Sequence, residues 1–284
     1  MPERAVRVDA HHHVWDLTVR DQPWTTGVIR RSFGVEDLLP LASQGSVEAT
    51  VLVQTVTVPE ETPEFLALAE QWPLVQAVVG WTDLTAEDVA DRLAELTGGT
   101  GGRWLRGIRH QVQGEPDPDW LCRAEVRRGL AAVGQAGLVY ELLTLPHQLP
   151  AAVRTVSELP EVRFVLDHCS KPPIASGELE PWAGEIRRLA ARENVACKLS
   201  GLVTEADHAN WSVADLRPYA EVVLAAFGPD RVMFGSDWPV CLLAAEYPEV
   251  LDATEQLTAE LSAAERERVF GGTATEVYRL RPGP

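Results

Sequence analysis

The sequence predicts an α/β fold, a single (β/α)8 barrel, from three observations: short apolar runs recur along the chain, amphipathic segments separate most of them, and no linker divides it. The chain has 284 residues, a length that α/β barrels commonly reach as one domain. A doubly wound open sheet is the alternative, but no G-x-G-x-x-G turn follows the first run. We therefore expect one barrel domain over residues 1–284.

Each expected strand is a short run rich in valine, isoleucine and leucine, which is typical of strands buried on both faces. The runs cover residues 7–10, 49–54, 75–81, 105–110, 138–143, 162–168, 195–199 and 231–236. That count matches the strand number of the barrel.

The segments between the strands have helical periodicity, and several carry signals for a helix start. Amphipathic stretches cover residues 60–71, 85–96, 123–136, 149–158, 182–192 and 219–227. Thr85 precedes acidic residues, and Ser262 precedes Glu265 at capping-box spacing, so both predict helix N-termini. Residues 14–46 form a long connection, of the kind that often serves as a lid or pocket wall.

The charge and composition of the chain argue against some classes of binding partner. The formal net charge is −17, from 25 Lys+Arg against 42 Asp+Glu, which argues against binding to nucleic acid or to an anionic membrane. We find no apolar run long enough to span a bilayer and no secretory signal at the N-terminus, so we expect a cytoplasmic protein. The sequence gives no signal for oligomeric state.

The first strand ends in a cluster of histidines. His11 and His13 follow Asp9 at a spacing of two, and alternate residues of an extended chain share a face. Both imidazoles are therefore aimed at one point, which is a metal ion or a substrate atom. The alternative is a polar strand end with chance clustering of histidines.

Polar residues also end the other expected strands, and a barrel has its site at the C-terminal ends of its strands. Each residue alone could be a structural ion-pair partner or a core histidine, but their convergence on one rim indicates a site. The residues are His11, His13, Gln54, Trp81, Asp83, Arg109, His110, Glu141, Asp167, His168, Lys171, Lys198, Ser200, Asp237 and Trp238.

These residue types suit the hydrolysis of an ester-like carbonyl. Such a reaction needs a base for water and groups that stabilise the oxyanion. Asp237 can be the base, and His11, His13 and His168 can polarise the carbonyl directly or through a metal. A side-chain nucleophile is disfavoured, because no G-x-S-x-G elbow is present and Cys169 faces away from its neighbour His168.

Tryptophans near the strand ends bear on the class of substrate that the site could bind. Trp15, Trp24, Trp81 and Trp238 lie on the predicted rim or in the first long connection. Aromatic rings can stack on a sugar face, whereas rim packing is the alternative use of each. We expect one or two of them in the pocket.

Three motifs in order resemble those of the amidohydrolase superfamily, in its branch of sugar lactonases. They are D-x-H-x-H at residues 9–13, D-H-x-x-K-P at residues 167–172 and G-S-D-W-P at residues 235–239. The runs at residues 107–110, 197–201 and 232–234 strengthen the match, which extends from about Val8 to Tyr278. The resemblance implies an amidohydrolase-type barrel that opens a sugar-acid lactone, such as L-fuconolactone or L-rhamnonolactone, by attack of water.

The resemblance also implies roles for individual residues. Asp237 matches the family's aspartate after the eighth strand, and His11, His13 and His168 match its histidines, so these four are the expected catalytic residues. Related enzymes that act on 2-pyrone-4,6-dicarboxylate hold its carboxylates with several arginines, whereas this rim offers chiefly Arg109, which favours a neutral polyol lactone. The expected substrate-binding residues are Arg109, His110, Gln54, Lys171, Trp81, Trp24 and Trp238.

The expected cofactor requirement is none, although one zinc ion is possible. Three imidazoles and a carboxylate suit zinc, so His11, His13, His168 and Asp237 would be its ligands. A binuclear centre of the family needs a bridging lysine or acid and two further histidines, and only His168 is clearly placed among these. Glu141 and Lys198 stand where other ligands would be, so the resemblance does not favour a binuclear site. Two other functions stay open: a zinc-dependent decarboxylase or amide hydrolase of the same superfamily, and a sugar-binding barrel without catalysis.

Overall fold

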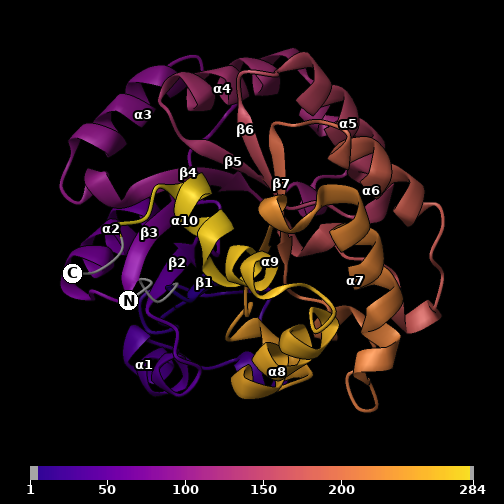
Figure 1. Cartoon of the computed structure of the whole chain (residues 1–284). Helices are drawn as coiled ribbons and strands as arrows, with labels where there is room; N and C mark the ends of the chain where they lie inside the picture. Colours follow the sequence, from indigo (N-terminus) through magenta and orange to yellow (C-terminus); the bar gives the residue numbers. More distant parts are fainter. Residues whose placement is uncertain (1–5, 282–284) are drawn as a thin grey trace.

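Eight parallel strands form the centre of the computed structural model, which describes residues 6–281 (Figure 1). Neighbours in the sheet follow the chain order without a crossover. The strands are β1 (Val8–His12), β2 (Ala49–Val53), β3 (Val75–Gly80), β4 (Leu105–His110), β5 (Val139–Leu142), β6 (Arg163–Leu166), β7 (Val195–Leu199) and β8 (Val232–Phe234). Seven of the eight predicted runs contain a strand, and the first, at residues 7–10, overlaps β1, which continues to His12. The predicted (β/α)8 barrel is confirmed.

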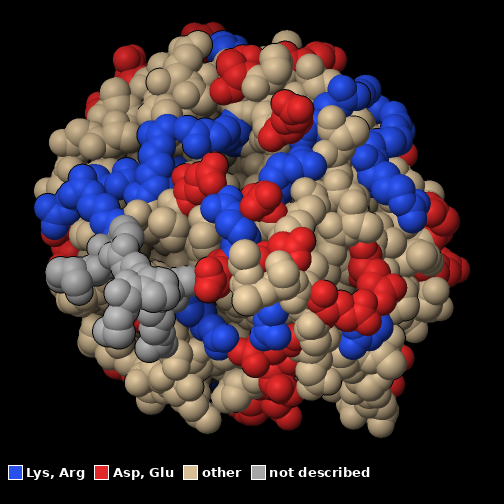
Figure 2. All heavy atoms as spheres, in the orientation of Figure 1, with Lys and Arg blue, Asp and Glu red and all other residues tan. Residues whose placement is uncertain are grey.

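Helices surround the strands as an outer ring, and two short helices near the C-terminus lie across one end of the barrel (Figure 1). The ring consists of α1 (Val35–Gln44), α2 (Glu61–Gln71), α3 (Val89–Gly98), α4 (Ala124–Gln135), α5 (Leu149–Glu158), α6 (Trp182–Ala190), α7 (Val213–Phe227) and α8 (Tyr247–Leu257). The end is covered by α9 (Ala263–Glu267) and α10 (Thr273–Tyr278). Figure 2 shows acidic and basic side chains interspersed on this face.

The barrel closes where the end of β1 meets the segment after β8. A parallel bridge joins His12 to Trp238, and the Asp237 amide donates to the carbonyl of His11 at 2.9 Å. The buried Asp9 carboxylate accepts from the amides of Ser236 and His11, at 2.8 and 3.1 Å. Asp9 therefore joins the first and last strands just below the predicted site.

The core has two layers. Small residues fill the barrel, with Ala10, Val51 and Val79 packed together and Tyr278 entering from α10. A larger cluster lies between the strands and the outer helices. Because Tyr278 packs with residues at the strand starts, α10 closes the end of the barrel opposite the predicted site.

Several predicted boundaries need correction. The sixth strand ends at Leu166, because Asp167 begins a tight turn with left-handed residues. The helix expected from Thr85 begins at Val89, since the Asp83 carboxylate accepts from the Thr85 amide and hydroxyl and holds a turn there. The start predicted from Ser262 is confirmed at α9.

The long first connection is not all loop, because its last part, Val35–Gln44, is α1. Its apolar residues are spaced for a helix, but Pro40 lies inside the run and obscures the pattern. The amphipathic segments expected from the sequence do not include α8 or α10. Within residues 6–281, no helix is long and apolar enough to cross a membrane.

Candidate active site

Three imidazoles from two places in the chain meet at one oxygen of Asp237. The Nε2 atoms of His13, His11 and His168 lie 3.5, 3.7 and 3.9 Å from Asp237 Oδ1. The Nε2 atoms of His11 and His13 are 3.1 Å apart. The structure therefore brings together all four side chains that the sequence predicted to be catalytic.

The end of β1 presents both histidines in one direction. Val8 and Ala10 pack inside the barrel, so strict alternation would continue inward with His12. The pairing with β2 is irregular between Asp9 and His12, and such an irregularity re-aims the following side chains. His11 and His13 consequently share a face, as predicted, while His12 is buried without a hydrogen-bond partner on either ring nitrogen.

His168 reaches the site from a strained segment. Residues 168–171 all have positive φ angles, between 50° and 58°, a conformation that costs energy for residues other than glycine. The His168 Nδ1 atom is 2.9 Å from the Ser200 hydroxyl. Gly201, at φ 65°, leaves the room for this ring, because a Cβ there would lie 2.7 Å from His168 Nδ1.

Asp237 is also left-handed, with φ 57°. Strained residues of this kind persist only where the surroundings hold them, and they are common at functional sites. Here the Asp237 amide is held by the His11 carbonyl, and the Trp238 amide donates to the Ser236 hydroxyl at 3.0 Å.

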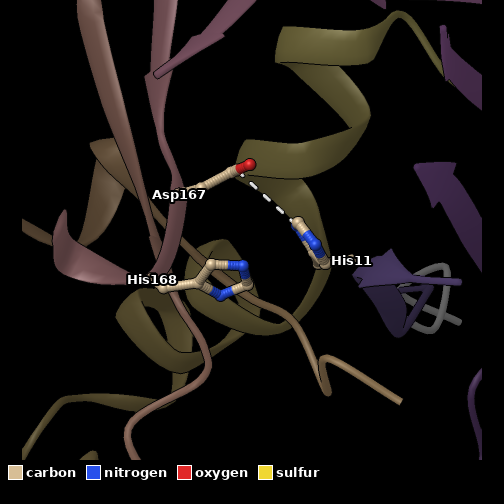
Figure 3. Close-up of side chains that lie close together, drawn as sticks. All are labelled: His11, Asp167 and His168. Carbon is tan, nitrogen blue, oxygen red and sulfur yellow. Dashed lines mark ion pairs between the residues drawn. The ribbon is translucent and has the colours of Figure 1, made fainter. Parts of the chain in front are cut away.

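A second set of charged side chains lies directly beneath the histidines, inside the barrel. Lys198 Nζ contacts Glu141 Oε1 at 2.7 Å, His11 Nδ1 at 3.0 Å and Asp167 Oδ1 at 3.1 Å. Arg109 Nη1 donates to Asp167 Oδ2 at 3.0 Å. The rings of His11 and His168 are 4.4 Å apart, and Figure 3 shows the imidazole of His11 facing Asp167.

The surroundings shift the pKa values of the catalytic candidates. Burial acts to raise the pKa of Asp237, but His168, His13 and Lys171 outweigh it and hold the pKa below its usual value. Burial lowers the pKa of His168 to about 4. Burial together with the charge of Lys198 holds the pKa of His11 well below its usual value. At neutral pH the site therefore combines the Asp237 carboxylate with neutral imidazoles at His11 and His168.

The predicted substrate-binding residues fall into two groups. Arg109 and Gln54 lie beneath the site and bind each other: Arg109 Nη2 donates to Gln54 Oε1 at 2.9 Å, and their exposed fractions are 2% and 0%. Trp238 is likewise buried, with its ring against Phe33. These three side chains are therefore shielded from solvent and contact other residues of the protein.

The other predicted binding residues are partly exposed. Trp81 Nε1 donates to His110 Nδ1 at 3.0 Å. On its other side, His110 contacts Glu115 at 2.7 Å. Lys171 pairs with Glu205 at 3.1 Å. Trp24 is 37% exposed, on the first long connection. Sequence reasoning missed the two acidic partners, which lie in loops without a motif.

The site has two groups of ligand atoms that could hold a divalent ion: His11, His13 and Asp237, and His11, Asp167 and His168. Ligand atoms around a tetrahedral zinc are about 3.3 Å apart when each bond is about 2.0 Å. The first group, with separations of 3.1, 3.5 and 3.7 Å, comes close to this spacing. The donor set therefore fits one ion.

Comparison with known proteins places these features in a family context. The family model described as Amidohydrolase matches residues 8–280. An L-fucono-1,5-lactonase of Burkholderia multivorans is 41% identical over 97% of each chain, and one of Burkholderia ambifaria is 39% identical over 96% of each chain.

Solved structures give the same result. A crystal structure of a Burkholderia multivorans amidohydrolase with bound zinc has a TM-score of 0.91 and 41% identity, covering 98% of this chain and 100% of that one. A 2,6-dihydroxybenzoate decarboxylase from Rhizobium has a TM-score of 0.67 at 13% identity, over 96% of this chain and 98% of that one, and shares the fold alone.

Proposed function

Since this chain belongs to the amidohydrolase family, we propose that its site hydrolyses a lactone of a sugar acid to the open-chain aldonate. The observation that carries the proposal is the meeting of three imidazoles at one oxygen of Asp237. The relatives named L-fucono-1,5-lactonase, about 40% identical over nearly the full length, support a six-membered lactone ring.

Asp237 acts as the general base. Its Oδ1 atom takes a proton from water as the water oxygen attacks the lactone carbonyl carbon, and the same proton passes to the ring oxygen when the carbon–oxygen bond breaks. His11, His13 and His168 surround the reacting atoms and orient the water and the carbonyl. His11, which lies beside the positive charges of Lys198 and Arg109, helps to stabilise the charge that develops on the carbonyl oxygen. The products are a carboxylate and a free hydroxyl group on one chain, and the second proton of the water is released to solvent.

Partly exposed residues hold the substrate. Trp81, His110 and Lys171 offer a ring face and donors suited to sugar hydroxyls. Glu115 and Glu205, which pair with two of them, add acceptors. Arg109, Gln54 and Trp238 support the catalytic groups from beneath or behind.

We further propose that hydrolysis needs no metal, because the positive charges of Lys198 and Arg109 already contact the ring of His11 at 3.0 and 3.3 Å. When bound, a divalent ion held by His11, His13 and Asp237 would polarise the carbonyl or the water. A chelator assay tests this proposal, because treatment that removes the metal would then leave lactone hydrolysis intact.

A panel of aldonolactones with a pH indicator tests the function. We expect turnover of L-fucono-1,5-lactone or a close stereoisomer above the spontaneous rate, and a loss of about 10³-fold or more in kcat for Asp237→Asn, because the variant has no base. Circular dichroism checks that the variant is folded. Full activity in folded Asp237→Asn would contradict the proposal.

The rival functions give different results in the same panel. A zinc-dependent decarboxylase or amide hydrolase would release no acid from any lactone and would lose its activity after chelation. A sugar-binding barrel would bind a lactone in calorimetry without turnover.

A further inference from the structure

The buried lysine beneath the site has a direct effect on one catalytic histidine. Lys198 is fully buried, and its ammonium group touches His11 Nδ1 at 3.0 Å. It pairs with Glu141 and Asp167 at 2.7 and 3.1 Å, so its charge is compensated within the barrel. An ammonium group can only donate hydrogen bonds, and His11 Nδ1 must therefore be the acceptor.

This contact determines where His11 carries its proton. A neutral imidazole has one acceptor nitrogen and one N–H, so a His11 ring that accepts at Nδ1 is protonated at Nε2. Arg109 Nη1 also approaches Nε2, but at a longer 3.3 Å, and it already donates to Asp167. The lysine contact is therefore the one that fixes the tautomer.

The neighbouring His13 has the opposite arrangement. Its Nδ1 atom is 2.7 Å from the carbonyl oxygen of Val53, and a carbonyl can only accept, so His13 is protonated at Nδ1 and has a free lone pair at Nε2. The 3.1 Å contact between the two Nε2 atoms is then a hydrogen bond from His11 to His13. Donors and acceptors alternate along the path from Lys198 through His11 and His13 to Val53, and the longer contact of Arg109 with His11 Nε2 lies outside this path.

A zinc ion between these rings would require a different state of His11. A metal ligand nitrogen must be free of its proton, so His11 would have to move its proton from Nε2 to Nδ1. The acceptor there would be Asp167 Oδ1, which lies 3.6 Å away and is paired with the ammonium group of Lys198 at 3.1 Å. Lys198 occupies the space beside the same nitrogen and opposes the change.

We propose that Lys198 is a positioning residue that holds His11 in the Nε2–H tautomer and thereby weakens zinc binding by His11, His13 and Asp237. It supplies a fixed positive charge beneath the catalytic group. Removing its ammonium group leaves Asp167 Oδ1 as the partner of His11 Nδ1, an arrangement in which a carboxylate orients a metal-binding histidine. The inference does not depend on which lactone the enzyme opens.

Two measurements independent of turnover test the proposal. Nitrogen-15 NMR of the metal-free protein reports which His11 nitrogen carries the proton, and we expect Nε2. Competition with a chromophoric chelator gives the zinc affinity, and we expect Lys198→Met to bind zinc about 10- to 100-fold more tightly than the unmodified protein. Lys198→Met combined with Glu141→Gln removes the pair together if the single variant fails to fold.

The chain offers a matched control, because its only other lysine is Lys171. Lys171 pairs with Glu205 and does not touch His11. Lys171→Met therefore also removes one positive charge near the site but leaves the contact to His11 intact, and we expect it to change the zinc affinity little. A proton on His11 Nδ1 in the unmodified protein, unchanged zinc affinity in the Lys198 variants, or an equal gain in Lys171→Met would each overturn the proposal. Loss of lactonase activity in Asp237→Asn tests the proposed function separately.

Discussion

At the scale of single residues, the acidity of the site sets the pH range in which it can work. A base must be ionised, and the pKa of Asp237 lies below its usual value of 3.8 because of His168, His13 and Lys171. The pKa of His168, lowered by burial to about 4, keeps this ring neutral above that pH. Both groups therefore hold their working charge states through the weakly acidic range.

The pH profile of lactone hydrolysis follows from these shifts. We expect kcat/KM to be nearly constant from about pH 5 to 7 and to fall below about pH 4, as His168 and then Asp237 take up protons. Initial rates between pH 3 and 7, corrected for spontaneous hydrolysis, measure the profile. An acidic limb near pH 6.5, the usual value of a histidine, would contradict this assignment.

The sequence was enough to predict which side chains meet at the site but not how deep each one lies. Spacing and strand alternation were sufficient for His11 and His13, and the motifs for His168 and Asp237. Gln54 and Arg109 also end strands, yet they bind each other beneath the histidines. Depth in a barrel depends on strand tilt and stagger, which a list of strand ends does not contain.

At the scale of elements, the turn after β6 is the part of the site where backbone strain is concentrated. Trp182 Nε1 donates to the Cys169 carbonyl at 2.8 Å, and the hydroxyls of Ser170 and Thr144 are 2.8 Å apart. These contacts hold four left-handed residues in place. The sequence did not predict the turn, because none of the four is a glycine.

A pair of substitutions at Lys171 measures this strain. Lys171 has φ 50°, and both Lys171→Gly and Lys171→Ala remove its ion pair with Glu205. Only glycine adopts the left-handed region without steric cost, so we expect Lys171→Gly to be more stable than Lys171→Ala by about 1 kcal/mol. Urea unfolding of both variants gives the difference, and equal stabilities would show that the turn is not strained at this position.

At the scale of the whole molecule, the last helix completes the barrel that the first strand begins. Tyr278 of α10 is buried inside the barrel, and its hydroxyl donates to Glu141 Oε1 at 2.5 Å. Glu141 in turn contacts Lys198, which touches His11. The repeating apolar runs were enough to predict the barrel. A helix as short as Thr273–Tyr278 has too little periodicity for the sequence to show that this helix closes one end of the barrel.

Substituting Tyr278 tests this closure and its dependence on pH. Burial and the charge of Asp167 raise the pKa of Glu141 to about 7, although Lys198 opposes them. A carboxyl group whose pKa is raised on folding reduces the free energy of unfolding as the pH rises from about 4.5 to 7. The Tyr278 hydroxyl matters most when this carboxylate is ionised, because hydrogen bonds to charged groups are stronger than those between neutral groups.

We therefore expect Tyr278→Phe to lower the free energy of unfolding by about 1.5 to 3 kcal/mol at pH 8, and by less at pH 5, where Glu141 is protonated. Urea unfolding at both pH values measures the two losses. The phenylalanine variant retains the packing of the ring, so Tyr278→Ala, which also leaves a cavity, is the control and should cost more at both pH values. The same loss of stability for Tyr278→Phe at pH 5 and pH 8 would contradict this prediction. It would mean that α10 stabilises the barrel through packing alone, independently of the charge on Glu141.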